Sequence, residues 1–214
     1  PPDRYTAPVP PDELPSEDEP LTVNGVVYNE MKGAFSSPES VLERFTSSVL
    51  FPDTPYSNES GGDPAVIPNL SYEQFIQFHK DYYHPANSYI YLYGDMDMEE
   101  KLLWLDKEYL SAYDKNDYNL DSSIALQKPF SEPVEKETVY SVTANEGTED
   151  NTYLSLNTVV GTDIDPVLYV AFQILDYTLI SAPGAPLKQA LIDAHIGQDI
   201  MGGYENGILQ PYFS

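Results

Sequence analysis

A single acidic side chain, Glu30, lies in a mostly apolar run that is compatible with a helix, residues 24–35. An unpaired carboxylate in apolar surroundings is costly, and a metal ion or a basic partner offsets that cost. The alternative is that Glu30 lies at the solvent edge of the helix, near Lys32. The pattern alone therefore makes Glu30 either a metal ligand or a surface residue.

The three histidines, His79, His84 and His195, do not form a chelating pair by spacing. His79 and His84 are separated by about 140° around a helix, whereas a chelating pair is spaced four residues apart. We expect them to be surface or helix-end residues. The sequence has no nucleophilic serine elbow, phosphate-binding loop or dinucleotide fingerprint. Spacing therefore predicts no catalytic and no cofactor-binding residue in this chain.

Helices are expected on both sides of the loop that follows the candidate residue. Ser37-Pro38 marks a break after residues 24–35 and places proline at the first position of a second helix. Ser71 and Gln74 have the spacing of a capping box, which predicts the start of a third helix.

A buried strand is predicted at residues 88–93, which are dense in strand-forming residues. Asp97 is expected to cap the next helix, whose apolar residues are spaced by four, three and four. Helix, strand and helix in this order predict a sheet with helices packed on it.

The second half repeats this mixture of elements. Two strands are predicted at residues 137–143 and 151–160. Asp165-Pro166 is typical of an N-cap followed by proline at the first helical position.

A further helix is predicted at residues 185–194, with Gly197 in the position that ends it.

The charge balance narrows the range of partners. The chain has 35 acidic and 10 basic residues, a formal net charge of −25. Such a field repels phosphates, so neither nucleic acid nor an anionic lipid surface is an expected partner. Basic or amphipathic peptides would be attracted, although the acidity could equally serve solubility.

Other classes are limited by residue content. The absence of cysteine excludes disulfides and thiolate metal sites. No apolar run reaches the roughly 18 residues of a membrane span, so none is expected. Residues 1–20 are rich in proline and acid and predict an extended arm. The chain begins without methionine and stops after a predicted strand, so we expect an internal piece of a longer protein.

The run Gly25-Val26-Val27-Tyr28-Asn29-Glu30-Met31-Lys32-Gly33-Ala34-Phe35 resembles the signature downstream of the zinc motif in insulinase/pitrilysin metallopeptidases, specifically their presequence-protease branch. Several blocks continue the resemblance in order to the end of the chain: residues 50–56, 60–64, 67–70, 78–87, 93–95, 181–187 and 190–193. The ordered blocks together make the resemblance specific.

In that family an inverted motif, His-x-x-Glu-His, supplies two zinc ligands and a general base, and a distal glutamate completes the site. By its position in the block, Glu30 resembles that distal ligand. Zinc with three protein ligands keeps a fourth position for a reactive water. The resemblance implies a zinc-dependent metalloendopeptidase that hydrolyses unfolded peptides.

The inverted motif itself is missing from this sequence. We therefore expect the chain alone to be inactive and not to retain zinc, the remaining ligands lying elsewhere in the same polypeptide. Two alternatives stay open: a non-catalytic family member acting as a scaffold subunit, and a peptide-binding module.

The resemblance implies an α+β fold with two related domains, each a mainly antiparallel sheet with helices on one face, and both incomplete here. The expected division is an arm at 1–23, the later part of a catalytic-type domain at 24–113, a connector at 114–134 and the start of a second domain at 135–214. The expected partners are peptide substrates, especially basic ones. The residues do not identify the compartment; a soluble, cytoplasmic parent protein is the expectation.

Overall fold

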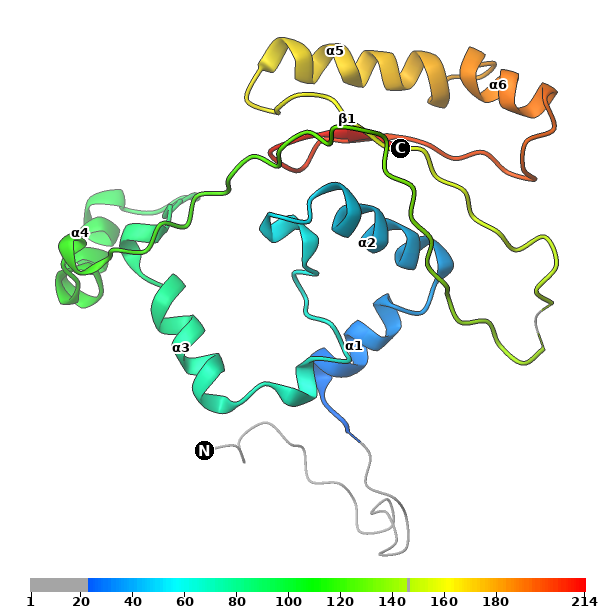
Figure 1. The fold of residues 1–214 in the computed structure, drawn as a ribbon. Helices are drawn as coiled ribbons and strands as arrows, with labels where there is room; N and C mark the ends of the chain where they lie inside the picture. The colour runs from blue at the N-terminus through cyan, green and yellow to red at the C-terminus, as the bar shows by residue number, and fades with distance from the viewer. Residues whose placement is uncertain (1–22, 146) are drawn as a thin grey trace, which may run out of the picture.

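The computed structural model describes residues 23–145 and 147–214, which form an open arrangement of helices around a small sheet (Figure 1). The arm expected at 1–23 lies outside the described residues except for Val23. The α-helices are α1 (Val26–Ala34), α2 (Pro38–Leu50), α3 (Tyr72–Tyr82), α4 (Met98–Glu108), α5 (Pro166–Asp176) and α6 (Pro186–Asp193). Short 3-10 turns are η2 (Pro55–Ser57), η3 (Ile67–Asn69), η4 (Pro85–Asn87), η5 (Leu110–Ala112) and η6 (Lys115–Asp117), and η7 (Tyr177–Ser181) is a π-helix.

Side-chain caps begin α2 and α3 where the sequence predicts these helices to start. Ser37 Oγ accepts a hydrogen bond from the Ser40 backbone N–H at 3.1 Å, at the start of α2. At α3, Ser71 Oγ accepts from the Gln74 N–H at 3.2 Å, and Gln74 Oε1 accepts from the Ser71 N–H at 2.8 Å. This reciprocal pair is the predicted capping box, and it satisfies two backbone donors that a helix start leaves free.

The later caps follow the same rule. Asp97 Oδ1 accepts from the Glu100 N–H at 3.0 Å and begins α4. Asp165 Oδ1 accepts from the N–H groups of Val167 and Leu168 and begins α5, with proline at the first helical position. Both predicted caps are confirmed.

The end of α6 corrects one prediction. The helix stops at Asp193, and His195, not Gly197, takes the left-handed conformation that closes it (φ 55°). The His195 N–H bonds the Ile192 carbonyl and the Ile196 N–H bonds the Leu191 carbonyl, which is the Schellman arrangement. Gly197 also has a positive φ, of 77°, but it lies beyond the cap.

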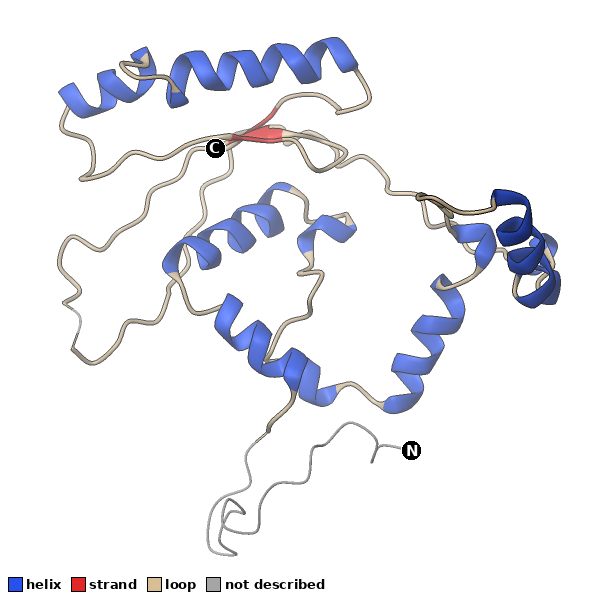
Figure 2. Cartoon of the chain, turned by 180° about the vertical axis from the view of Figure 1, so that it is seen from behind, coloured by secondary structure: helices blue, strands red, loops and turns tan. Residues whose placement is uncertain are grey.

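The sheet has three short antiparallel strands in the order β1 (Thr158–Val159), β3 (Tyr212–Phe213), β2 (Tyr204–Glu205). Figure 2 shows α5 and α6 on one side of the sheet and α2 on the other. On the α5 side, the Phe172 ring lies 5.6 Å from the rings of Tyr204 and Phe213. The expected α+β class is therefore confirmed in its coarse form, a mixture of helices and a small antiparallel sheet.

Most of the predicted strands do not form within the part of the chain that the structure describes. Residues 88–93, 137–143 and 151–157 have no ladder partner, and the predicted strand at 151–160 is reduced to Thr158–Val159. A strand needs a neighbour for its backbone N–H and C=O groups. In the extended segment 88–93, the exposed fraction of Tyr89 is 105%. The residue types favour a strand there, but these residues have no neighbouring strand to pair with.

The described residues bury little apolar surface. Their buried apolar side chains are Met31, Phe51, Ala185, Pro211 and Tyr212. The chain exposes 17676 Å², whereas a compact folded monomer of 24.0 kDa exposes about 10,000 Å². Large apolar faces are therefore uncovered.

The helical stretch at residues 166–193 meets the length and composition test for crossing a membrane, with a mean hydropathy of 1.2. It is interrupted, because Ala182 has an extended backbone between η7 and α6 (ψ 149°). The eleven residues of α5 and five of η7 fall short of the roughly 20 that a spanning helix needs. The absence of a membrane span stays a prediction.

Candidate metal-binding helix

Helix α1 carries Glu30 on an exposed face. Val26 and Val27 lie four and three residues before it, so the three side chains share one side of the helix. The exposed fractions of Val26 and Val27 are 86% and 55%. Glu30 is thus a surface residue of this chain, but the surface around its carboxylate is apolar and uncovered.

Lys32, the expected neighbour of Glu30, points elsewhere. Its Nζ lies 5.5 Å from the centre of the Tyr28 ring. Among the described residues, the ion pairs within 4.0 Å are Lys101–Glu100 and Lys107–Glu108. Lys32 therefore does not neutralise the Glu30 carboxylate.

A neighbouring side of α1, about 100° around the helix from Glu30, is held by Met31, which is 7% exposed. Gly61, in the loop after α2, packs against it so closely that a Cβ there would lie 2.4 Å from Met31 Sδ. A larger residue at position 61 would therefore require the end of the Met31 side chain to shift. The loop thus packs against α1 at the residue next to Glu30.

The C-terminal end of α1 is held by Arg44 from α2. Its Nη1 donates a hydrogen bond to the Ala34 carbonyl at 2.9 Å, and its guanidinium lies 3.4 Å from the centre of the Phe35 ring. A cation at the end of a helix also interacts favourably with the helix dipole. Arg44 therefore joins α1 and α2 into one hairpin.

The histidines take structural positions, as expected. The His79 ring stacks on Tyr83 at 4.6 Å. His84 Nδ1 accepts from the Ala86 N–H at 3.1 Å, which caps η4, and its ring stacks on Tyr118 at 5.2 Å. Within residues 23–145 and 147–214, no three His, Cys, Asp or Glu side chains come together as a metal site. Glu30 offers one ligand, and these residues do not complete a zinc site.

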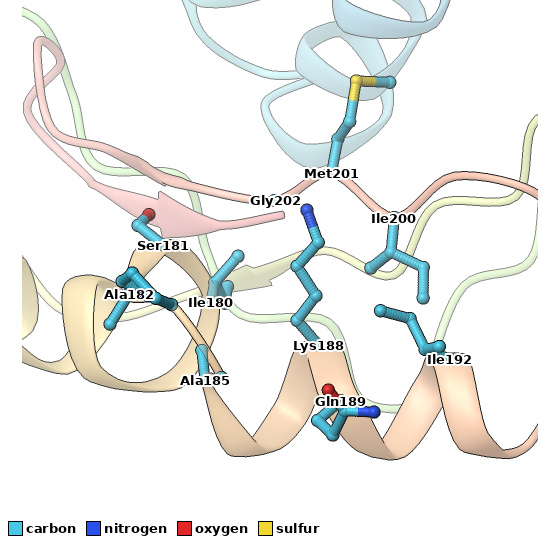
Figure 3. Close-up of a pocket in the computed structure, with 12 residues that line it drawn as sticks. Ile180, Ser181, Ala182, Ala185, Lys188, Gln189, Ile192, Ile200, Met201 and Gly202 are labelled. Atoms are coloured by element: carbon cyan, nitrogen blue, oxygen red, sulfur yellow. The ribbon is translucent and has the colours of Figure 1, made fainter.

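A pocket that spacing arguments did not anticipate lies at the start of α6. It has a volume of about 460 Å³ and is lined in part by Ile180, Lys188, Ile192, Ile200 and Met201. Figure 3 shows Lys188 extending from α6 toward Gly202. One cation among aliphatic side chains suits binding better than acid–base chemistry, which needs a titratable pair. Its sequence signal is the segment 181–187, whose glycine and prolines interrupt the helices.

On the side of the sheet that faces α2, the hydroxyl of Tyr212 in β3 has a raised pKa. Burial raises the pKa of its hydroxyl, the Ser47 side chain lowers it by hydrogen bonding, and the charges of Glu205 and Glu43 raise it further. The group is 6% exposed, so burial dominates.

Comparison with known proteins agrees with the resemblance seen in the sequence. The family model described as the peptidase M16 inactive domain matches residues 69–214. Protein HypA of Clostridium perfringens is 47% identical over 198 residues, which cover 92% of this chain and 20% of that protein. Presequence protease 1 of Arabidopsis thaliana is 36% identical over 201 residues, covering 93% of this chain and 18% of that protein.

The mitochondrial presequence protease of Xenopus tropicalis is 33% identical over 202 residues, covering 91% of this chain and 19% of that protein. The chain thus spans about a fifth of the length of the curated relatives it matches. The predicted resemblance to insulinase-type peptidases is confirmed: the chain belongs to the peptidase M16 family.

Proposed function

We propose that this chain is part of a zinc-dependent metalloendopeptidase that hydrolyses unfolded peptides, and that Glu30 is its distal zinc ligand. The observation that carries the assignment is an exposed carboxylate on an uncovered apolar helix face, beside Val26 and Val27. When that face is covered, a carboxylate without a cation would be costly to bury. A zinc ion offsets this cost.

The remaining ligands would come from the same polypeptide outside these residues. Zinc, when bound, supplies Lewis-acid activation of a water molecule. The part assigned to this chain is narrower: it holds one carboxylate in place. Met31 packs against Gly61, and Arg44 joins α1 to α2.

Peptide substrates are inferred from relatives that are named presequence proteases. The net charge of −25 and the scarcity of ion pairs among the described residues favour basic peptides. We also propose the domain architecture that the family resemblance implies: residues 24–113 and 135–214 would each belong to one of two related domains, whose sheets are completed by the rest of the polypeptide.

A cytoplasmic location stays a prediction; two of the relatives are named as organellar proteins.

A second candidate is a non-catalytic family member that acts as a scaffold subunit. The description of the matched family model as an inactive domain favours it. Sequencing the coding region upstream of residue 1 separates the two candidates. An intact His-x-x-Glu-His motif supports the peptidase, and its loss would establish the scaffold.

A further inference from the structure

Three segments that are far apart in the sequence meet on the α2 side of the sheet, at residues 51–56, 127–128 and 209–212. We call this place the three-segment junction. Gln127, which is 7% exposed, lies at its centre. Its Oε1 accepts from the Asp53 backbone N–H at 2.9 Å, and its Nε2 donates to Asp53 Oδ2 at 2.8 Å.

The backbone of Gln127 contacts the third segment. Its N–H donates to Gln210 Oε1 at 2.5 Å, and its carbonyl accepts from Gln210 Nε2 at 3.2 Å. Nearby, the Tyr56 hydroxyl accepts from the Leu209 N–H at 3.0 Å. Two glutamines and one tyrosine therefore connect all three segments.

The junction is also the best-buried part of the described chain. Phe51 is 0% exposed, and its ring lies 5.8 Å from that of Tyr56 and 6.1 Å from that of Tyr212. Pro211 is fully buried beside them. Asp53 itself is exposed, so its hydrogen bonds with Gln127 are partly buried, and the burial is on the Gln127 side. A buried carboxamide left without a partner is costly.

The chemistry at Asp53 requires a carboxamide at position 127. Asp53 presents one donor, its N–H, and one acceptor, its carboxylate, side by side. A carboxamide offers a matching acceptor and donor, whereas a carboxylate offers acceptors only. A glutamate at position 127 would still accept from the N–H but would face the Asp53 carboxylate.

We propose that Gln127 is a positioning residue that fixes the α1–α2 hairpin against the C-terminal sheet. Phe51 directly follows α2, Arg44 joins α2 to α1, and Gln210 precedes β3. Gln127 thus sets where the helix that carries Glu30 stands relative to the sheet. Its importance for catalysis rests on the proposed function, but the junction itself does not.

Hydrogen exchange measured by mass spectrometry on the full-length polypeptide, without zinc or peptide, tests this role. In Gln127→Glu, exchange at the Asp53 and Leu209 amides should rise by about tenfold or more, while amides of α3 and α4 keep wild-type rates. Gln198→Glu makes the same change at an exposed position and should leave the junction unchanged.

The double variant Asp53→Asn with Gln127→Glu decides the mechanism. It exchanges the two functional groups, because the new carboxamide at position 53 can donate to the new carboxylate at position 127. Exchange should therefore return toward the wild-type rate. Wild-type exchange in the single variant, or a double variant no slower than the single one, would overturn the proposal. If Gln127→Glu unfolds the protein, recovery in the double variant still tests it. A failed zinc assignment at Glu30 would leave these rates unaffected.

Discussion

The three-segment junction and the α3–α4 region use similar side chains in opposite ways. At the junction, Phe51 is completely buried between aromatic rings. In α3 and α4, which lie away from the sheet in Figure 1, Phe75 and Trp104 are 68% and 61% exposed. Apolar side chains are buried only when other segments cover them, and few segments reach α3 and α4 here.

Helix α3 has an apolar side that no other described segment covers. Phe75 and Phe78 occupy one side of α3, as a helix packed on a sheet requires, yet both are exposed. Contiguous apolar surface of this kind marks an interaction site. We infer that segments of this chain cover the apolar side chains of the junction, whereas those of the α3–α4 region need the rest of a longer polypeptide to cover them.

The largest effect should come from separating the chain from that polypeptide. The isolated 214 residues should bind a hydrophobic dye such as ANS strongly and unfold without a cooperative transition, because their apolar faces are uncovered. The full-length protein should bind little dye and unfold cooperatively. Weak dye binding and a sharp transition in the isolated chain would contradict the inferred dependence.

Two alanine substitutions in the full-length protein sharpen the comparison. Phe51→Ala should lower the free energy of unfolding by about 3–5 kcal/mol, because it leaves a cavity between two rings. Phe75→Ala should also cost more than about 1 kcal/mol if the rest of the protein covers α3. Chemical denaturation measures both. A cost within about 0.5 kcal/mol for Phe75→Ala would show that α3 stays exposed.

The cap of α3 provides a smaller, local test. Ser71→Ala removes the acceptor for the Gln74 N–H and should cost about 1 kcal/mol of unfolding free energy. Ser71→Asp keeps an acceptor at the same position and serves as the matched control. Equal costs for the two variants in denaturation experiments would mean that the cap does not stabilise this helix.

The smallest effect concerns alkaline pH at the junction. Burial raises the pKa of the Tyr212 hydroxyl above its ordinary value of 10.0. The neutral form is therefore favoured in the folded state: its contribution is complete below pH 10 and is lost as pH rises from there through the folded pKa. In Tyr212→Phe the free energy of unfolding should decline less steeply between pH 9 and 11. A decline as steep as in the wild type would contradict the assignment.

Helix starts were predictable from sequence because the groups involved are close along the chain. Ser71 bonds Gln74 and Asp165 bonds Val167, so each cap is visible within a few residues. The end of α6 was predicted at the wrong residue, since glycine is the usual left-handed residue and here His195 takes that conformation.

Long-range partners were not predictable. Gln127 lies 74 residues from Asp53 and 83 from Gln210, and nothing in its neighbourhood distinguishes it from other polar connector residues. The predicted strand at residues 88–93 failed for the related reason that residue type cannot supply a partner strand.

The candidate metal site likewise combines a residue that the sequence could identify with long-range contacts that it could not. Glu30 was identifiable from its apolar sequence neighbours and from the family-like run at residues 25–35, whereas the side chains that hold its helix were not. Gly61 contacts Met31 only because the loop after α2 folds back onto α1, and spacing along the chain does not show this. The role of Arg44 depends on the angle between α1 and α2.

The most direct test of the Glu30 assignment is the zinc content of the full-length protein, measured by metal analysis after exposure to a competing chelator. Glu30→Gln keeps the size of the side chain but removes its charge, so the variant should lose most of its zinc and its peptidase activity while Glu73→Gln, on exposed α3, retains both. Unchanged zinc content and an unchanged rate in Glu30→Gln would contradict the proposed ligand.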